Sequence, residues 1–414
     1  RSGLAEGIAR ALLRADTQDA FAHYVLARAV HQQGRPTEAR GAAARAFRYS
    51  RTDPHRFEAA QLAARSALDA GQITRAQYWL RRATDVAPDA RAHAVAVRDF
   101  QALRRMAPLK WSLRLGIAPS SNVNNGAEDA LNEIEGVPVV GLLSPDALAL
   151  SGVEATADLS LRYRMAESPR ARTEAVARIY LRRVRLSDEA REKAPAARGG
   201  DYAMTLLEAG LAHDRLLRDG RSVLSLSGRL GDIRYAGDPY LDYARVDLGM
   251  DRRAGDSGRL SLGLGLEARR YVARPDMPER RATLSLGYAH VFGSGDRLRV
   301  GLSLHGNEVD NVNLRADGAT AHLSYAFGHP FGPVSVSASL AAGIRHYPDY
   351  RVATIPVPGG RRDESLSATL QLAFQDMTHA GFMPVVSLTA ERTDSNVGRF
   401  ETEALSIGFS LRSA

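Results

Sequence analysis

The 414-residue sequence contains no cysteine. The fold therefore depends on neither disulfides nor thiolate metal ligands, which is compatible with export through an oxidising compartment. The sequence also lacks an uninterrupted run of 18 apolar residues, because arginines interrupt even its richest apolar stretches, and this excludes a transmembrane helix. A membrane β-barrel stays open, since its strands are short and only half apolar.

The chain begins at Arg1, not at an initiator methionine, and no apolar signal segment follows. We therefore expect that any export signal has been removed or is left out of this sequence. The missing signal is not evidence against export.

Motifs for catalysis, nucleotide binding and metal binding are missing. The sequence has no Gly-x-x-x-x-Gly-Lys-Ser/Thr loop, no His-x-x-x-His pair and no Gly-x-Ser-x-Gly elbow. Its 11 histidines are scattered singly, and we expect His290, His305 and His322 to be lumen or interface residues of strands. The arginine-rich segments lack the interleaved aromatics of a nucleic-acid platform. We expect no catalytic residue, no cofactor, no metal site and no nucleic-acid partner.

All of the formal net charge of +8 lies in the first quarter of the chain. Residues 1–107 contain 18 arginines and 10 acidic residues, whereas the remainder holds 37 basic and 37 acidic residues. Two domains with different physics therefore meet near Pro108. The basic surplus is either ordinary solvated helical surface or a docking face for an anionic client.

Small residues recur at a fixed interval within residues 1–107. One set returns 37 residues later as a second set, which predicts stacked helical hairpins whose helices cross closely. The pattern resembles the tetratricopeptide repeat, with Pro88 at the usual closing position. The two sets are Ala27, Gly34, Ala39 and Ala46, then Ala64, Gly71, Ala76 and Ala83.

The repeat register extends toward the start of the chain. Ala5, Ala9 and Leu12 are expected to form the packing face of a helix whose partner is missing, so the chain would open inside a repeat. The same register places seven residues on a concave side, which is either solvated surface or a groove for an extended peptide. These residues are Phe21, Tyr24, Arg28, His31, Glu58, Gln61 and Arg65.

From Trp111 onward the hydrophobic period changes from 3.6 to 2. In "RLSLGLGLEAR", residues 259–269, leucines occupy one face while charged and small residues occupy the other. A sandwich would bury those leucines, whereas a membrane barrel turns them toward lipid. Strands of about ten residues recur near 111–119, 153–164, 171–187, 201–213, 221–234, 240–253, 259–272, 280–292, 295–308, 317–328, 332–346, 362–375, 382–396 and 402–413.

The connections between these strands alternate in length. Short turns such as "GDSG" and "GSGD" alternate with longer connections, which include 120–152, 188–200 and 347–361. Outer-membrane barrels have short periplasmic turns and long external loops. The sequence therefore predicts a periplasmic helical domain, residues 1–107, followed by an antiparallel outer-membrane barrel of about 14 strands, residues 108–414. We expect the barrel to be a monomer surrounded by outer-membrane lipid.

A Ser-Asn-Val tract follows the first strand and recurs after the thirteenth. In a closed barrel the last strand pairs with the first, so both tracts would flank the closing edge on the outer side. Asn and Ser are also ordinary turn formers. The tract residues that we single out are Ser121, Asn122, Asn124, Ser395 and Asn396.

The opening strand runs into "GIAPSSNVNNG", and the chain closes on "RTDSNVGRFETEALSIGFSLR". With the helical repeats and the barrel, these segments resemble the surface lipoprotein assembly modulator (Slam) family. The resemblance implies transport of surface lipoproteins, or of soluble haem- or metal-acquisition proteins, across the outer membrane. One departure is the end of the chain, Arg412-Ser413-Ala414, where such barrels usually carry an aromatic residue.

Two other functions stay open. A polysaccharide export porin also joins such repeats to a barrel, and it predicts a basic or aromatic track in the lumen. A passive porin with an accessory interaction domain is the third possibility. "RTEAVARIYLRRVRL", residues 172–186, is the one arginine-rich strand in an otherwise balanced domain.

Overall fold

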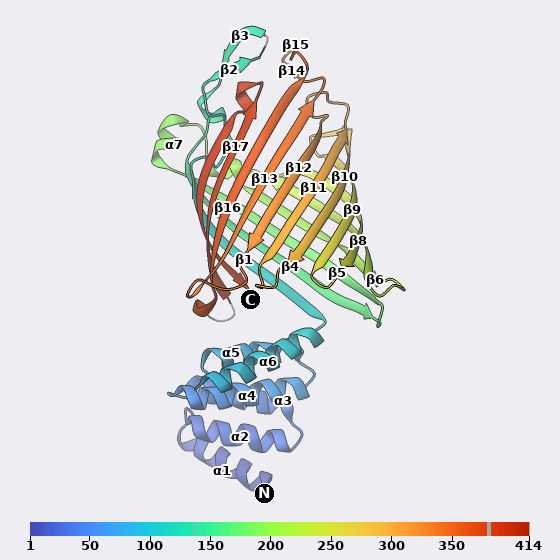
Figure 1. The fold of residues 1–414 in the computed structure, drawn as a ribbon. Helices are drawn as coiled ribbons and strands as arrows, with labels where there is room; N and C mark the ends of the chain where they lie inside the picture. Colours follow the sequence, from blue (N-terminus) through green and yellow to red (C-terminus); the bar gives the residue numbers. More distant parts are fainter. Residues whose placement is uncertain (136, 379–381, 414) are drawn as a thin grey trace. The chain divides into compact units, whose positions relative to one another are not determined.

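The computed structural model describes residues 1–135, 137–378 and 382–413. The chain forms two compact units, which comprise Arg1–Lys110 and the described residues from Trp111 onward. The first unit is helical and the second is a β-barrel (Figure 1). The predicted boundary at 107/108 falls between the last helix of the first unit, which ends at Met106, and the first strand, which begins at Leu109.

Six helices make up the first unit. Asp19 and Asp89 cap two of them by accepting hydrogen bonds from the backbone N–H groups of Ala22 (3.0 Å) and Ala92 (2.7 Å). Glycines with positive φ, Gly34 (75°) and Gly71 (71°), close the turns between paired helices. The helices are α1 (Ser2–Ala15), α2 (Ala20–Gln32), α3 (Pro36–Tyr49), α4 (Asp53–Asp69), α5 (Ile73–Asp85) and α6 (Ala90–Met106).

The core of this unit consists mostly of alanine. The alanines of both predicted sets are at most 4% exposed, because side chains this small let neighbouring helices approach closely. Larger side chains fill the space at helix crossings, and Phe47 meets Trp79 edge to face at 5.6 Å between ring centroids.

The prediction for α1 was wrong in one position. Ala9 is fully buried as expected, but Leu12 is 45% exposed, and Leu13 packs against the core in its place. The reason is helical periodicity, since Leu13 follows Ala9 by four residues on one face. Leu12 instead continues the exposed stripe of Leu4 and Ile8.

Ion pairs fasten α1 to the following hairpin. Glu6 accepts from Arg35 (2.6 Å), and Arg10 donates to Glu38 (2.6 Å). Hydrogen bonds from Arg35 and Arg10 lower the pKa of Glu6 to about 2. Glu6 therefore keeps its negative charge, and this attachment, at any pH above that value.

The second unit is a closed antiparallel barrel of 14 strands, which confirms the predicted fold class. In chain order β1 is joined to β4, and neighbouring strands pair in sequence until β18 pairs with β1. The strands are β1 (Leu109–Ser120), β4 (Gly152–Glu167), β5 (Ala171–Leu186), β6 (Met204–Leu216), β7 (Ser222–Tyr235), β8 (Asp238–Ala254), β9 (Gly258–Tyr271), β10 (Arg274–Val291), β11 (Arg297–Glu308), β12 (Asp317–Ala326), β13 (Val334–Tyr347), β16 (Arg361–Phe374), β17 (Phe382–Ser395) and β18 (Thr402–Ser413).

The long connections contain structure that the sequence pattern did not predict. Two small hairpins project from the ends of the strands, β2 (Leu131–Ile134) with β3 (Val137–Leu142), and β14 (Arg351–Val352) with β15 (Ile355–Pro356) (Figure 1). A short helix, α7 (Asp188–Lys193), follows β5. The strand predicted at 201–213 begins late, because Gly199–Tyr202 forms a 3-10 turn before β6.

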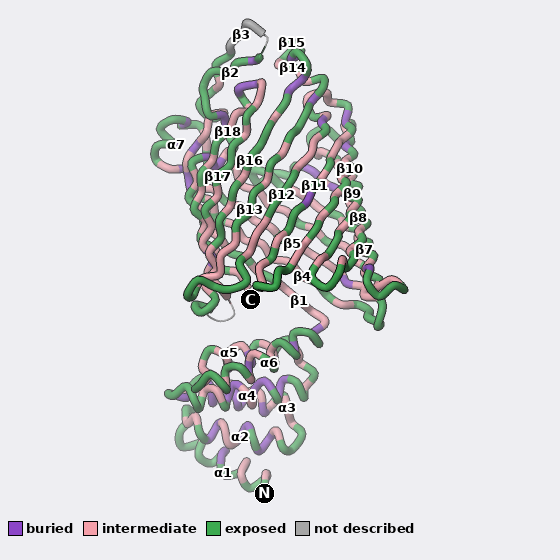
Figure 2. Tube along the Cα trace, in the orientation of Figure 1, coloured by how far each residue is buried: buried purple, intermediate pink, exposed green. Residues whose placement is uncertain are grey.

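Apolar side chains cover the outside of the barrel. Leu262 and Leu264 of β9 are 47% and 41% exposed, while the small residues that alternate with them, Ser261, Gly263 and Gly265, are half-buried. The same alternation runs along the other strands (Figure 2). This is the reverse of a soluble sandwich and matches a wall that faces hydrocarbon. The barrel therefore spans a membrane, as the sequence predicted.

The two ends of the barrel differ. One end, here called the short-turn end, has connections such as 168–170 and 255–257, whereas the long-loop end has 121–151, 187–203 and 348–360. β1 begins at the short-turn end. Within the described ranges, no helix reaches the length and hydropathy needed to cross a bilayer.

The orientation of the wall can be tested at mid-strand in β11. Leu302→Arg places a cation in hydrocarbon, at a cost of about 2–4 kcal/mol near the bilayer midplane. Ser303→Arg places the same side chain in the lumen. We expect the first variant, and not the second, to lose the heat-modifiable folded band in outer membranes and to unfold at lower urea. Equal behaviour of the two variants would contradict the assigned faces.

Candidate functional site

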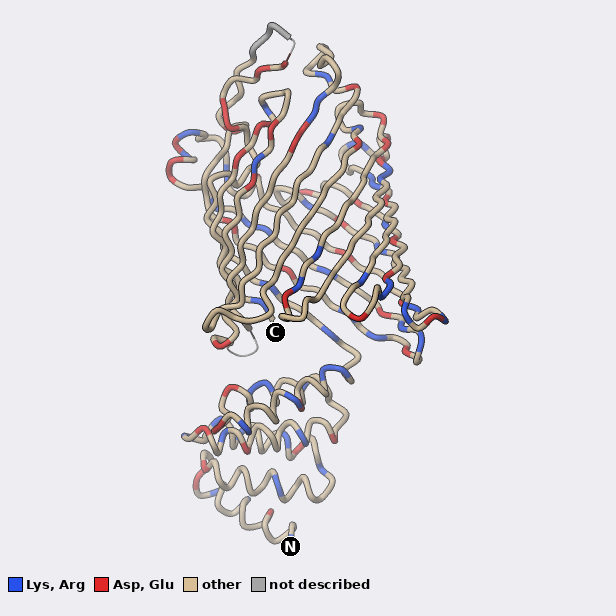
Figure 3. Tube along the Cα trace, in the orientation of Figure 1, with Lys and Arg blue, Asp and Glu red and all other residues tan. Residues whose placement is uncertain are grey.

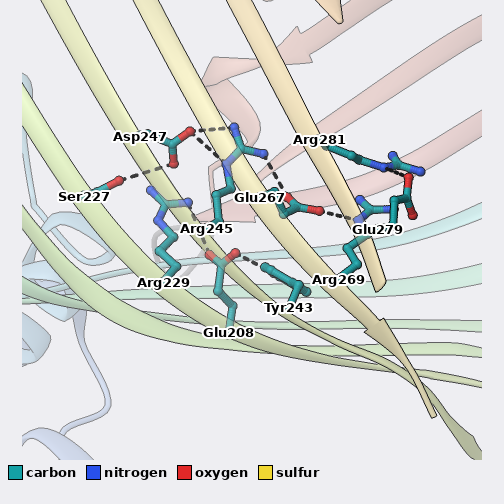
Figure 4. A network of polar contacts seen from close by, with 10 residues as sticks. All are labelled: Glu208, Ser227, Arg229, Tyr243, Arg245, Asp247, Glu267, Arg269, Glu279 and Arg281. Atoms are coloured by element: carbon teal, nitrogen blue, oxygen red, sulfur yellow. Dashed lines mark hydrogen bonds and ion pairs between the residues drawn. The ribbon is translucent and has the colours of Figure 1, made fainter. Parts of the chain in front are cut away.

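The inner face of the barrel carries a lattice of charged side chains on β6 to β10, shown in Figure 4. Glu208 of β6 accepts from Arg229 (3.2 Å) and from the hydroxyl of Tyr243 (2.6 Å). Arg245 then bonds Asp247 (2.8 Å). The first of these contacts joins neighbouring strands, the second spans from β8 to β6 across β7, and the third runs along β8.

The lattice continues across β9 and β10. Arg245 reaches Glu267 at 3.5 Å, and Glu267 also pairs with Arg269. Glu279, which is 1% exposed, pairs with Arg281 and accepts from Asn307 of β11 at 2.6 Å. Buried carboxylates of this kind are stable only with such partners.

The same arrangement covers β4 and β5. Arg178 holds Asp158 through two bonds of 2.9 Å each, and Arg182 holds Glu154 at 2.6 Å. Arg172, Arg178 and Arg182 of the arginine-rich segment 172–186 face the lumen, and carboxylates of β4 pair with the last two. Arg183 and Arg185 lie on the opposite face of β5. We call the lumen face of β4 to β10 the charged wall.

The opposite part of the lumen is lined by small neutral groups. Strands β12, β13, β16 and β17 are largely free of charge along their middle parts (Figure 3). Thr369 and Thr389 lie 3.2 Å apart, side by side on β16 and β17. We call this surface the hydroxyl wall, and it includes Ser337, Ser339, Ser365, Ser367, Thr369, Ser387, Thr389, Thr393, Ser406 and Ser410.

The three strand histidines occupy different environments. His305 lies on the lumen face of β11, and the ring of His322 covers Gly301, where an added Cβ would meet it at 2.1 Å. His290 stacks on Tyr288 near the short-turn end. Across the described ranges, no three His, Cys, Asp or Glu side chains gather as a metal site would require.

The barrel closes where β1 pairs with β18, and we call this edge the seam. Its register runs from Arg114 opposite Arg412 to Ser120 opposite Ser406, as predicted for the first and last strands. Pro119 of β1 lacks the N–H group that a ladder position needs. Arg114 and Arg412 are like charges directly opposite each other, which weakens a strand pair.

Hydrogen bonds continue beyond the seam at the long-loop end. The segment 121–135 runs beside 396–405, and main-chain atoms take part in every link. The backbone N–H of Ser121 donates to Leu405 O (3.1 Å), and the other links are Asn122 to Glu403 O (3.2 Å), Glu128 N to Glu401 O (2.9 Å), Arg399 N to Asn132 Oδ1 (2.9 Å) and Glu135 N to Asn396 O (3.1 Å). We call this row the loop ladder.

The two asparagines of the Ser-Asn-Val tracts have separate partners. Asn122, 7% exposed, donates to Gly126 O (2.9 Å) and Glu403 O, so it fastens the end of β1 to β18. Asn396 accepts from the N–H of Arg362 (2.8 Å) and donates to Gly360 O (2.9 Å). The side chain of Asn396 therefore does not bond the loop of Asn122, because its amide points toward β16 and β17 lies between β16 and β18.

The remaining tract residues stabilise their own loops. Asn124 donates to Leu148 O (2.7 Å) and accepts from the N–H of Leu150 (2.9 Å), closing the 120–152 connection. Ser121 Oγ accepts from the N–H of Leu405 (2.9 Å), across the seam. Ser395 donates to Asp363 (2.8 Å) on β16.

The predicted peptide groove of the helical unit lies on α2 and α4. Phe21 is 71% exposed, and Arg28 and Arg65 are exposed. Burial raises the pKa of Tyr24, which also lies near the carboxylate of Glu58. Gln61 is half-buried on the same helix as Glu58.

His31 is the one predicted groove residue with two side-chain partners. Its Nδ1 lies 3.1 Å from Ser66 Oγ, and its Nε2 lies 3.3 Å from Asp69. His31 therefore connects α2 to α4. Its place on the predicted face is compatible with support of the groove.

The sequence analysis missed Arg361. Its guanidinium lies 3.3 Å from the ring centroid of Phe400 and 4.1 Å from that of Tyr347, and it bonds Asp363 at 2.6 Å. These partners come from three separate segments of the chain. No local pattern around Arg361 marks such an aromatic enclosure.

Comparison with known proteins finds similar β-barrel structures and no matching family. No family model and no curated protein matches this sequence. OmpT of Vibrio cholerae is similar in structure at a TM-score of 0.38 and 9% identity, over 74% of this chain and 97% of that one. A bacterial polysaccharide outer membrane secretin is similar in structure at a TM-score of 0.35 and 10% identity, over 73% of this chain and 97% of that one. An outer membrane channel from Pseudomonas putida F1 is similar in structure at a TM-score of 0.36 and 11% identity, over 73% of this chain and 95% of that one. These structural similarities assign no function to this chain.

Substitution can separate the roles of the two asparagines. Asn122→Ala leaves the buried N–H of Gly126 without its side-chain acceptor, at a cost of about 1–3 kcal/mol. We expect faster amide exchange around 121–126 and 403–405 in the folded barrel, measured by mass spectrometry. The matched variant Asn396→Ala should instead speed exchange around 360–363. Faster exchange at the seam in both variants would contradict the assignment.

Proposed function

We propose that this chain is an outer-membrane translocator that moves client proteins to the cell surface. The clients are surface lipoproteins or soluble haem- or metal-acquisition proteins, as the resemblance to the Slam family implies. The supporting observation is the arrangement of the chain, in which a helical unit of repeated hairpins leads directly into a 14-stranded barrel. The two tracts that carry the resemblance lie at the closing edge of that barrel.

The helical unit would collect the client in the periplasm. The chain enters the barrel at the short-turn end, which faces the periplasm in outer-membrane barrels. Arg28 and Arg65 make no ion pair or side-chain hydrogen bond among the described residues, and both lie near Tyr24 on one face. Unpaired cations beside an exposed Phe21 suit an extended client segment that carries acidic residues.

The walls of the lumen support transport of a protein over export of a polysaccharide. The polysaccharide alternative calls for a free basic or aromatic track. On β6 to β10, Arg229, Arg245, Arg269 and Arg281 are paired with carboxylates, and Tyr243 and Tyr271 are hydrogen-bonded to glutamates. A smooth hydroxyl wall presents weak, interchangeable hydrogen bonds to a passing chain. We propose no enzymatic activity.

The seam supplies a second route, between strands. A lateral opening would let a lipid anchor stay in the membrane while the rest of the client crosses. Pro119 and the opposed Arg114 and Arg412 lower the cost of parting β1 from β18. We therefore propose that the client uses the seam.

The translocator function itself is tested by the surface proteins. Deletion of the gene that encodes this chain should remove specific proteins from the cell surface. Biotinylation of whole cells followed by mass spectrometry detects this loss. An unchanged set of surface proteins would contradict the function. The depleted proteins are then the clients for the following experiments.

A disulfide tests the lateral route. Ser120 and Ser406 are cross-strand partners on the lumen side of the seam, and the natural chain contains no cysteine. With both replaced by cysteine, we expect export to stop under oxidation and to resume with reductant. The control pair, Thr369→Cys with Thr389→Cys, joins β16 to β17 and should not stop export. Normal export while the disulfide holds the seam closed would mean that the client passes through the lumen and not through the seam.

Charge reversal tests the groove. Arg28→Glu with Arg65→Glu should weaken capture of the client several-fold, because the groove then repels acidic segments. Arg48→Glu with Arg75→Glu is the control, since these exposed arginines lie on α3 and α5. Binding of purified client to both proteins is compared at two salt concentrations. Equal binding by the two double variants would make the α2–α4 face ordinary solvated surface.

A further inference from the structure

A polar cavity of about 270 Å³ lies in the lumen near the long-loop end. Strands β11, β12, β13, β16, β17 and β18 contribute to its wall, and the connection between β17 and β18 contributes Arg399 and Phe400. None of the residues that line the cavity belongs to the charged wall of β4 to β10.

Small residues leave this space open. Thr320, Gly343, Ser365, Thr393 and Thr402 are successive cross-strand partners on five neighbouring strands. Gly343 is needed there, because an added Cβ would lie 2.7 Å from Ser365 Oγ. The result is a row of hydroxyl donors with room in front of it.

The charge of Arg361 is already matched at the edge of this cavity. It is 8% exposed and bonds Asp363 through three contacts of 2.6 to 3.1 Å. The rings of Tyr347, Tyr350 and Phe400 hold the guanidinium in place. Asp363 is the one carboxylate among the residues that line the cavity.

Two further arginines line the cavity without such a partner. Neither Arg345 nor Arg399 makes an ion pair or a side-chain hydrogen bond within the part of the chain that the structure describes. The Nε2 atom of His305, also in the lining, is buried and has no hydrogen-bond partner. The lining therefore carries two arginines that form no ion pair, although Arg399 lies within electrostatic reach of Asp146 and Arg345 lies opposite Asp363 in the strand register. It also carries spare polar groups. In the middle of the charged wall, by contrast, Arg178, Arg229 and Arg245 meet carboxylates.

We infer that this cavity is a binding site for an oxyanion, a carboxylate or a phosphate group. Guanidinium groups match both oxyanions with paired hydrogen bonds. The hydroxyl row supplies additional donors to the same anion. A volume near 270 Å³ is below the range of about 300–1,000 Å³ typical of ligand sites, so the site takes one small group and not a folded partner.

The experiment uses the purified full-length protein in detergent at constant ionic strength. Isothermal titration calorimetry with inorganic phosphate, and separately with acetate, measures binding and tells the two oxyanions apart. Arg345→Gln with Arg399→Gln should weaken binding at least tenfold. Folding of each variant is checked by its heat-modifiable band.

A matched control is available at the other end of the lumen. Arg114 and Arg412 are lumen-facing arginines outside the cavity, and Arg114→Gln with Arg412→Gln should leave binding unchanged. Equal weakening of anion binding by the two double variants would mean that the positive charge of the lumen in general, and not this cavity, attracts the anion. Failure of the unmodified protein to bind either anion would overturn the site. Both outcomes are independent of export, because no client is present.

Discussion

The constraint on which this barrel depends is that hydrocarbon offers no hydrogen bonds to the backbone. Every strand must therefore find two neighbours, and a sheet achieves this only by closing on itself. Closure joins β1 to β18, the two most distant strands in the sequence. It also divides every strand into a lipid face and a lumen face, so that leucines point outward and the polar residues share one enclosed surface.

That enclosed surface has to balance its charges within itself. On the charged wall the balance is made across strands, since Arg178 of β5 bonds Asp158 of β4 and Arg229 of β7 bonds Glu208 of β6. Such cross-strand pairs also fix the register, because a slip of one residue would turn every charge toward lipid. The hydroxyl wall needs no such balance, and its side chains are short. The two walls thus differ in the length of their side chains as well as in charge.

Much of this fold could be predicted from the sequence, because alternation is a local signal. "RLSLGLGLEAR" identifies a strand by itself, and an even count of strands implies the closing pair. The side-chain partners could not be predicted in this way. Asn122 and Asn396 share a motif, yet one bonds across the seam and the other bonds toward β16, since this depends on neighbours brought near only by closure. The enclosure of Arg361 and the place of Leu13 on α1 depend on tertiary packing in the same manner.

The loop ladder determines where the seam is weakest. At the long-loop end, parting β1 from β18 would break the bond from Asn122 to Glu403 O and would also disturb the small buried cluster in which Ile134 meets Val397. At the short-turn end Arg114 faces Arg412, and the N–H of Leu113 bonds Ser413 Oγ (3.0 Å). Like charges oppose that pairing, whereas the ladder reinforces the other end. A seam built in this way would part first from the short-turn end, the side on which the chain enters the barrel, and the ladder would act as its hinge.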